Sequence, residues 1–315
     1  MRGKYVTETL RVEESGIARA AETLRAGGLV AVPTETVYGL AARADSEAAV
    51  ADIYAAKGRP SFNPLIVHVA SLDAAREFAD FSPQAEALAQ AYWPGPLTLV
   101  LPRKPEAGLA AAVTAGLDTI ALRMPAHPVM RRVVEETGLP LAAPSANRSG
   151  YISPTSAAHV LASLDGRIQA VLDGGECERG LESTIAAVRG DGTVEILRPG
   201  PVELDAGKGA GGGIEAPGQL ASHYAPGKPV RLMATQVAPD DFVIGFGDIA
   251  GDCSLSESGD LAEAAARLYA CLHLGARSPK PRIAVAPIPA EGIGVAINDR
   301  LQRAATPPDQ SSSGS

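Results

Sequence analysis

The stretch from Ala56 to Val69, which reads AKGRPSFNPLIVHV, constrains the fold of this chain more than any other. Its apolar, β-branched run over 65–69 predicts a buried strand. Pro60 disfavours helical geometry at the preceding residue, so we expect Lys57 and Arg59 to lie on extended chain and to point the same way. Two fixed cations at a sheet edge suit an anion such as a polyphosphate. The alternative is a helix end with solvated cations and a histidine satisfied in the core.

The composition describes a globular chain with an acidic balance. Of 315 residues, 46% are hydrophobic and only 4% aromatic, so we expect a core of Ala, Val, Leu and Ile, in one large domain plus a small one. The net charge of −8 argues against a general nucleic-acid binder, whose footprint is a basic surface. Any contact with RNA would need a local basic patch.

The cysteines and the apolar runs predict a cytoplasmic protein. Cys177, Cys253 and Cys271 lie far apart, and an odd, sparse set of this kind is typical of reduced thiols. No apolar run approaches the ~20 residues that a membrane span needs. Residues 1–13 are charged and polar, unlike a signal peptide.

Hydrophobic periodicity predicts alternating helices and strands over the N-terminal two thirds of the chain. A helix over 15–26 stops at Gly27-Gly28, and Ser46 caps a second helix that Gly58 ends. Further helices are expected over 71–79, 82–92, 127–137 and 154–164, and strands over 29–32, 65–69, 97–101, 119–123, 139–144, 168–172, 183–188 and 194–197.

Polar residues recur two or four positions apart at the ends of these strands. If the run 34–40 is extended, three hydroxyls share one face, although an ordinary strand rich in β-formers has the same pattern. Together the pairs predict one concave sheet face that suits a small polar ligand plus an anion. The residues are Thr34, Thr36 and Tyr38, Lys57 and Arg59, Thr119 and Arg123, and Ser145 and Asn147.

Residues 203–229 differ in character from the rest of the chain. Glycines crowd into 207–213, which is typical of a flexible linker, and a His223-Tyr224 pair follows between two Pro-Gly turns. This segment is either a tethered lid or a plain connector. Over 230–305, strands alternate with helices, which predicts a small parallel α/β domain. The Pro- and Ser-rich tail over 306–315 is predicted to be disordered.

Common nucleotide and hydrolase motifs fail on their spacing. The glycines of 243–251 are one position off a dinucleotide fingerprint and open no helix. Gly207-Lys208 lacks the earlier glycine of a P-loop, because Val202 stands in its place. No nucleophile elbow, HExxH or paired catalytic carboxylates occur, so any ATP site must work without a Walker motif.

Eight motifs, in order along the chain, resemble one family. The chain is similar to the threonylcarbamoyl-AMP synthases, the YrdC-like family in its longer two-domain form, over roughly 10–202. The resemblance extends to Ser222–Pro226 and Ala296–Arg300. The eight motifs are Pro33–Leu40, Lys57-x-Arg59, Asn63–His68, Trp93–Thr98, Arg123–Pro125, Ala143–Asn147, Glu182–Thr184 and Leu197–Pro201.

The resemblance implies synthesis of L-threonylcarbamoyladenylate from ATP, bicarbonate and L-threonine with release of pyrophosphate. The product would serve N6-threonylcarbamoyladenosine modification of tRNA next to the anticodon, through downstream transferase machinery. Mg²⁺ would accompany ATP. The implied fold is α/β: a YrdC-like catalytic domain over 1–202, whose twisted mixed sheet lines a concave, positive cleft, a linker or lid over 203–229, and a small Rossmann-like domain over 230–305.

The resemblance also assigns site residues. The family's Lys-x-Arg and Ser-x-Asn signature falls on Lys57, Arg59, Ser145 and Asn147, with Lys57 and Arg59 in the catalytic role. The ATP side falls on Arg59, Asn63, Thr119, Ser145, Asn147, Ser153, Arg198 and Tyr224. The threonine side falls on Thr36, His68, Arg123, Ala143 and Ser183, the alanine through its backbone. No side chain is identified as a metal ligand.

Two other function classes fit parts of the chain. An RNA-binding module would use the concave face without turnover, although acidic residues outnumber Lys and Arg by 36 to 28. A carbamoyl-transfer relative shares the core but would normally carry zinc-finger-like cysteine pairs, which this sequence lacks. Pyrophosphate release that requires both threonine and bicarbonate separates the synthase from the RNA-binding module.

Overall fold

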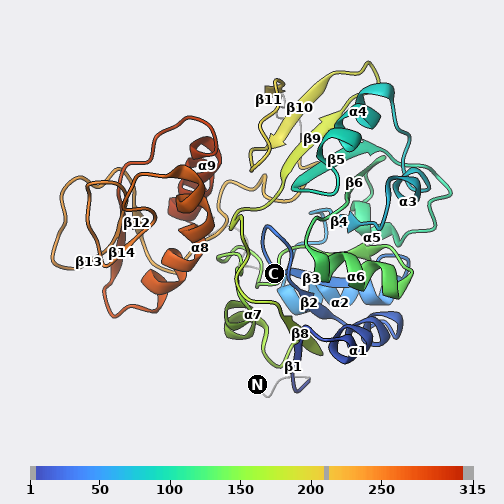
Figure 1. Cartoon of the computed structure of the whole chain (residues 1–315), viewed down its shortest axis with the longest axis horizontal. Coiled ribbons are helices and arrows are strands. Elements are labelled where there is room, and N and C mark those ends of the chain that lie inside the picture. The colour runs from blue at the N-terminus through green and yellow to red at the C-terminus, as the bar shows by residue number, and fades with distance from the viewer. Residues whose placement is uncertain (1–4, 209–212, 308–315) are drawn as a thin grey trace, which may run out of the picture.

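Two β-sheets organise the chain, and a linker joins them (Figure 1). The computed structural model describes residues 5–208 and 213–307. A large mixed sheet has 11 strands in the order β1-β8-β2-β3-β7-β4-β6-β5-β9-β10-β11, and a small parallel sheet has 4 in the order β12-β15-β13-β14. The predicted α/β class with a second, parallel unit is therefore confirmed. Within the predicted glycine cluster over 207–213, residues 209–212 lie outside the described residues, and so does the tail from 308.

The strands of the large sheet are short and largely buried. They are β1 (Glu8–Arg11), β2 (Val30–Val32), β3 (Gly39–Arg43), β4 (Ile66–His68), β5 (Leu97–Pro102), β6 (Thr119–Arg123), β7 (Leu141–Ala142), β8 (Ala170–Asp173), β9 (Thr184–Val188), β10 (Val194–Arg198) and β11 (Gly207–Lys208). The small sheet comprises β12 (Val230–Arg231), β13 (Asp241–Gly245), β14 (Cys253–Ser254) and β15 (Arg282–Val285).

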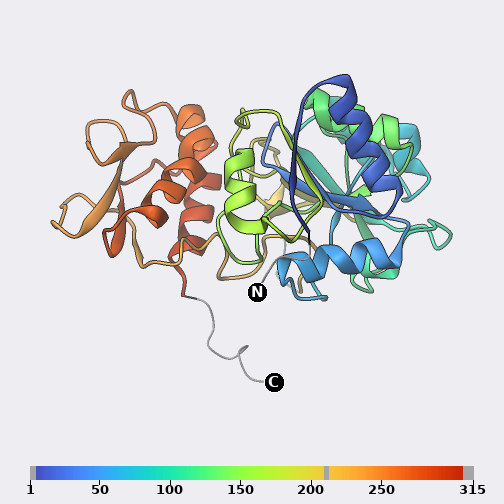
Figure 2. The same cartoon turned by 90° about the horizontal axis from the view of Figure 1, so that it is seen from below.

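Helices cover both faces of the large sheet. On one face, α1 and α6 pack on β2 and β8 through a cluster that includes Ile17 and Val133, and α2 lies on the other face (Figure 2). Ser46 caps α2 by accepting from the Ala49 amide, and Gly58, with a φ of 58°, ends it as expected. The helices are α1 (Glu14–Arg25), α2 (Glu47–Lys57), α3 (Leu72–Arg76), α4 (Pro83–Tyr92), α5 (Ala111–Thr114), α6 (Pro128–Thr137), α7 (Ala157–Leu164), α8 (Leu261–Arg277) and α9 (Gly294–Ala305).

Two local predictions are wrong. The run 34–40 is a bend rather than an extended strand before Gly39, because the Thr34 hydroxyl accepts from the amides of Thr36 and Val37. Lys57 is the last residue of α2 rather than part of an extended segment, since Pro60 affects only the residue before it.

The two units pack closely through α7 and α8 (Figures 1 and 2). The rings of His159 on α7 and His273 on α8 stack with centroids 3.9 Å apart. Gly180, at a φ of 67°, lies so close to α8 that a Cβ atom there would come within 2.4 Å of the Ala266 carbonyl oxygen. The interface therefore excludes any side chain at this position.

Across the described ranges, no helix has both the length and the apolar character that crossing a membrane requires.

The stacked histidines make the interface sensitive to acid. Burial lowers the pKa of His159 to about 4, and burial together with the His159 charge lowers that of His273 to about 3. The unfolded chain titrates histidine near about 6.5. It therefore binds more protons than the fold between about pH 6.5 and these lowered values, so stability that is complete above pH 6.5 is lost as the pH falls.

We expect thermal unfolding to show this loss. Between pH 7.5 and pH 5, the wild-type chain should lose more stability than a His159→Gln/His273→Gln variant, by about 1 kcal/mol or more. Because each protein is compared with itself at two pH values, any pH-independent effect of the substitutions on the free energy of unfolding cancels. Parallel losses in the two proteins would contradict the prediction.

Candidate active site

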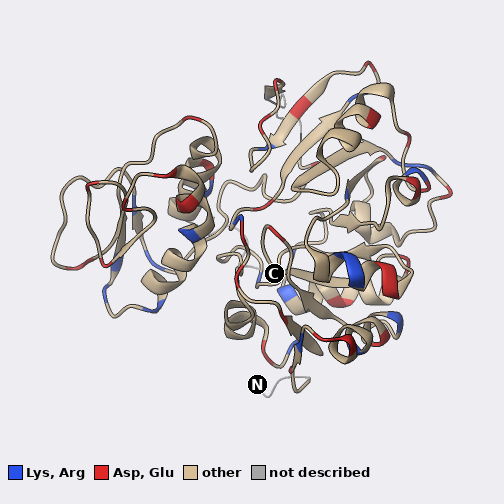
Figure 3. Ribbon diagram, viewed as in Figure 1, with Lys and Arg blue, Asp and Glu red and all other residues tan. Residues whose placement is uncertain are grey.

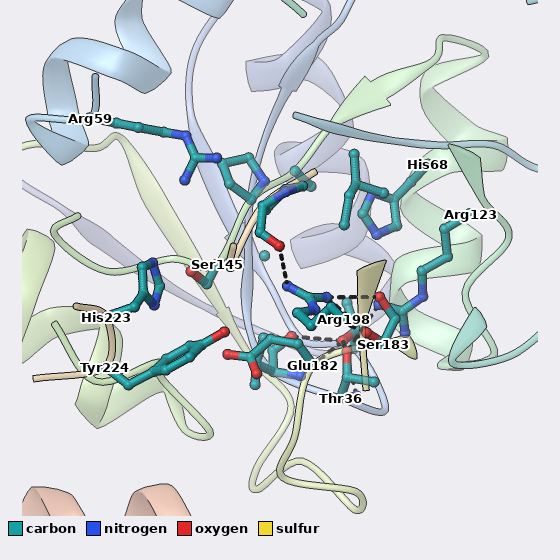
Figure 4. A pocket seen from close by; sticks show the side chains of 18 residues that line it. Thr36, Arg59, His68, Arg123, Ser145, Glu182, Ser183, Arg198, His223 and Tyr224 are labelled. Atoms are coloured by element: carbon teal, nitrogen blue, oxygen red, sulfur yellow. Dashed lines mark hydrogen bonds between the residues drawn. The ribbon is translucent and has the colours of Figure 1, made fainter. Parts of the chain in front are cut away.

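A small cavity of about 40 Å³ lies where the large sheet meets the linker (Figure 4). Its walls come from the bend after β2, the segment after α2, the ends of β4, β6 and β10, the segments after β7 and before β9, and the linker. Water occupies roughly 30 Å³ per molecule, and ligand sites are about 300–1,000 Å³, so the cavity as described is smaller than a nucleotide site. The lining residues are Thr34, Thr36, Val37, Gly39, Arg59, Ile66, His68, Arg123, Ala143, Pro144, Ser145, Glu182, Ser183, Arg198, Pro217, Gly218, His223 and Tyr224.

Arg123 ends β6 and is buried in an ion pair. Its Nη2 donates to Glu35 Oε1 at 2.5 Å, its Nη1 to Thr36 Oγ1 at 3.0 Å and its Nε to the Gly95 carbonyl at 3.2 Å. Burial would raise the pKa of Glu35, but the charge and hydrogen bond of Arg123 outweigh it and leave the pKa below its usual value. A guanidinium has five N–H donors, so Arg123 keeps donors beyond these three contacts.

Two further guanidinium groups are held by backbone carbonyls instead of carboxylates. Arg59 donates from Nε to the Asn63 carbonyl at 3.2 Å and from Nη2 to the Pro64 carbonyl at 2.9 Å. Arg198 donates from Nε and Nη2 to the Ser183 carbonyl at 3.1 and 2.9 Å, and from Nη2 to the Ser183 hydroxyl at 3.1 Å. Burial lowers the pKa of Arg59 to about 10. These cations therefore favour an anionic ligand.

Lys57 lies behind the cavity wall and does not line it. Its Nζ donates at 2.6 Å to the carbonyls of Ser145 and of Asn147, which fixes the loop that presents the Ser145 side chain. Burial, with the charge of Arg59, lowers the pKa of Lys57 well below its usual value. The expectation that Lys57 and Arg59 point the same way fails, because the helix ends between them.

The structure gathers most of the predicted site residues but leaves others outside the cavity. His68, Ala143 and Ser145 line it with the arginines, Thr36, Ser183 and Tyr224. Burial, with the charge of Arg123, lowers the pKa of His68 to about 3, so its ring is neutral. The predicted residues that do not line the described cavity are Asn63, Thr119, Asn147 and Ser153, and Tyr38 points away to the backbone of Gly174 and Gly175.

Two carboxylates were not predicted as site residues. Glu35 pairs with Arg123, and Glu182 lines the cavity beside Ser183. Each lies in a motif that resembles the family, but sequence alone shows no partner for either. For Glu182 the partners come from residues 87 and 118 positions further along the chain.

The linker contributes a histidine and a tyrosine to the lining of the cavity. The rings of His223 and Tyr224 meet edge to face, with centroids 4.1 Å apart. In the part of the chain that the structure describes, Tyr224 Oη and His223 Nδ1 are buried without a hydrogen-bond partner. Burial lowers the pKa of His223 to about 3. Both groups lie at the cavity, where a ligand with polar atoms would satisfy them.

The arrangement suits binding and positioning more than covalent catalysis. The cavity combines three arginines, hydroxyls and neutral imidazoles. In the described ranges, no group of three His, Cys, Asp or Glu side chains could hold a metal ion. Acidic and basic residues are interspersed along the ribbons of both units (Figure 3).

Comparisons with known proteins agree with the two-unit organisation. A family model described as telomere recombination, for Sua5, YciO and YrdC proteins, matches residues 22–200. A model described as the C-terminal domain of threonylcarbamoyl-AMP synthase matches 181–306.

Similar proteins match over nearly the whole chain. Threonylcarbamoyl-AMP synthase of Bacillus subtilis is 39% identical over 95% of this chain and 96% of its own length, and that of Pyrococcus abyssi is 39% identical over 93% and 95%. The solved structure of Pyrococcus abyssi Sua5 complexed with L-threonine covers 96% of this chain and 97% of its own, with a TM-score of 0.85 and 36% identity. With matches of this extent in both units, the chain belongs to the threonylcarbamoyl-AMP synthase family.

Proposed function

We propose that this cavity is the active site in which the threonylcarbamoyl-AMP synthase joins ATP, L-threonine and bicarbonate. The observation that carries the proposal is the convergence of Arg59, Arg123 and Arg198 on one cavity. Three buried guanidinium groups match the anionic groups of these substrates, namely the phosphates of ATP and the carboxylate of threonine.

The threonine side of the proposed site centres on Arg123. Thr36, His68, the Ala143 backbone and Ser183 line the same cavity and offer hydroxyl, ring-nitrogen and carbonyl groups to an amino acid. The complex of the Pyrococcus abyssi relative with L-threonine supports threonine as a ligand of this fold. Arg123 would grip the substrate carboxylate while Glu35 holds the guanidinium in place.

The nucleotide side of the proposed site centres on Arg59 and Arg198. Ser145 and Tyr224 line the cavity beside them. Asn63 has both side-chain polar atoms buried without a hydrogen-bond partner in the described structure, which favours a role with a ligand. Thr119, Asn147 and Ser153 would act from positions around the cavity, and Lys57 would act by fixing the backbone of Ser145 and Asn147.

The chemistry needs positioning and charge neutralisation. The amine of threonine and bicarbonate condense to a carbamate with loss of water. A carbamate oxygen then attacks the α-phosphorus of ATP, and the bond to the bridging oxygen breaks to release pyrophosphate. Arg59 and Arg198 would stabilise the negative charge that develops on the phosphates. The N-carboxylated amino acid decomposes readily in water, so a cavity that the linker closes has an evident purpose.

Mg²⁺ would enter bound to ATP rather than to a protein site. Mg²⁺ binds through few carboxylates and keeps several waters and substrate phosphates as ligands. Glu182, the carboxylate that lines the cavity, already accepts hydrogen bonds at both oxygens. The ion would supply additional charge neutralisation on the phosphates.

The same proposal extends to the domain boundaries, the location in the cell and the fate of the product. We place the catalytic domain over 1–202, the linker over 203–229 and a Rossmann-like domain over 230–305. The three cysteines are free thiols, which supports a cytoplasmic location. The product would pass to the transferase machinery that modifies tRNA.

Turnover with all three substrates tests the function, and Arg59 tests the site. The wild-type chain should release pyrophosphate only when ATP, threonine and bicarbonate are all present, with the adenylate identified by mass spectrometry. Arg59→Ala should lower kcat/KM about a hundredfold, because it removes a charge from the transferring phosphates. Arg43→Ala, which breaks a surface pair with Asp45, is the matched control. RNA binding without turnover, or near-native turnover in Arg59→Ala, would contradict the proposal.

Arg123 should discriminate between the substrates. A lysine cannot reproduce a planar, two-point grip on a carboxylate, so Arg123→Lys should raise the KM for threonine roughly tenfold, and that for ATP far less. Arg76→Lys, at a surface pair with Glu86, serves as the control. Equal increases in the two KM values would place Arg123 elsewhere in the reaction.

The linker should protect the reaction from water. If Ser222–Pro226 is replaced by a Gly-Ser stretch of equal length, both units should stay folded while ATP consumption becomes partly uncoupled from adenylate yield. AMP and free threonine should then accumulate. Unchanged coupling and rate would show that the segment is only a connector.

A further inference from the structure

The carboxylate of Glu182 joins the cavity to the C-terminal unit. It lines the cavity and accepts hydrogen bonds from Ser153 Oγ at 2.5 Å, from Tyr269 Oη at 2.9 and 3.0 Å, and from Arg300 Nε at 2.9 Å. Tyr269 belongs to α8 and Arg300 to α9, and neither lines the cavity in the described structure. Burial would raise the pKa of Glu182, but the charges of Arg300 and Arg198 hold it at about 2. The buried carboxylate is therefore ionised.

The same two residues support the tyrosine that closes the cavity. The ring of Tyr224 lies 5.6 Å from that of Tyr269, and Arg300 Cζ lies 5.5 Å from the centre of the Tyr224 ring. The neighbouring backbone is also tied to the end of α9. The His223 amide donates to the Arg303 carbonyl at 3.2 Å, and Ser222 Oγ donates to the Thr306 carbonyl at 2.8 Å.

Arg300 and Tyr269 thus contact two walls of the cavity at once. One wall contains Glu182, which directly precedes Ser183, and the Ser183 carbonyl accepts hydrogen bonds from Arg198. The other wall is the linker segment that carries Tyr224. Both supporting side chains are fully buried, and Arg300 also pairs with Asp299. Such contacts define one position for each wall.

We infer that Tyr269 and Arg300 are positioning residues. Through their contacts, the C-terminal unit orients the Glu182 carboxylate and holds the Tyr224 ring in place where the linker lines the cavity. The inference rests on the proposed function of the cavity. The C-terminal unit would then have a role in the reaction, although none of its residues lines the described cavity. When the linker moves away, Tyr224 would lose its contacts with Tyr269 and Arg300. The hydrogen bonds to Glu182 would keep these two side chains in position until the linker returns.

Conservative variants separate positioning from simple loss of the fold. Arg300→Lys keeps the charge beside Glu182 but loses the planar contact with Tyr224 and the Nε geometry. Tyr269→Phe keeps the ring beside Tyr224 but removes the hydroxyl that donates to Glu182. Arg282→Lys is the matched control, because Arg282 also pairs with a buried carboxylate of the C-terminal unit, Asp241, at 3.0 Å.

Two measurements test the inference on the full chain. Hydrogen exchange should show the peptide 220–227 losing protection about tenfold in Arg300→Lys, as for loss of a charged contact, while strands β5 and β6 stay protected. Turnover should show less adenylate formed per ATP consumed in both Arg300→Lys and Tyr269→Phe. Arg282→Lys should change neither readout.

The outcomes are distinct. If Arg300→Lys and Tyr269→Phe keep wild-type coupling and protection, or if Arg282→Lys has the same effects, the inference is wrong. Hydrogen exchange in the linker needs no substrate, so it tests the contacts of Tyr224 with Tyr269 and Arg300 even if the wild-type chain forms no adenylate. A wild-type chain that forms no adenylate would overturn the proposed function alone.

Discussion

The burial of cations whose hydrogen bonds go mainly to the main chain is the constraint on which the rest of this structure depends. Lys57, Arg59 and Arg198 are all held mainly by main-chain carbonyls. Carbonyl dipoles offset only part of the cost of removing a cation from water, so these buried cations favour an anionic ligand. The carbonyls come from segments far apart in the chain, and the large sheet brings them together. The core is thus as necessary to the site as its lining.

The division of labour between the two units follows from the same constraint. The large sheet supplies the groups that face the cavity, whereas the C-terminal helices supply side chains that stand behind them. The Glu182 carboxylate lies at the boundary, where the charges of Arg198 from the large unit and Arg300 from the C-terminal unit both act on it. A reaction that relies on positioning gains most from such support, because no protein nucleophile has to be activated.

Sequence reasoning found the elements that local signals specify. The Ser46 cap and the Gly58 stop define α2, and the alternation of strands with helices over 230–305 predicted the small parallel unit. It failed where a side chain redirects the backbone, as Thr34 does in the bend before Gly39. It also failed where contacts are remote in sequence: nothing near Glu182 indicates a tyrosine and an arginine from helices over 80 residues away. The ordered motifs identified the site residues in the sequence. How these residues lie relative to one another is determined by the sheet, which the motifs do not describe.

Tyr224 adopts a left-handed backbone conformation, with a φ of 62°, although it is not glycine. That conformation costs an L-residue about 1–2 kcal/mol, which the ring contacts with Tyr269 and Arg300 must offset. The observed backbone at this position is therefore held by the contacts of the side chain and not by local preference. Glycine at 224 would adopt the same backbone without this cost, but it would lose the ring contacts with Tyr269 and Arg300. The shape of the segment that lines the cavity thus depends on the C-terminal unit as well as on its own sequence.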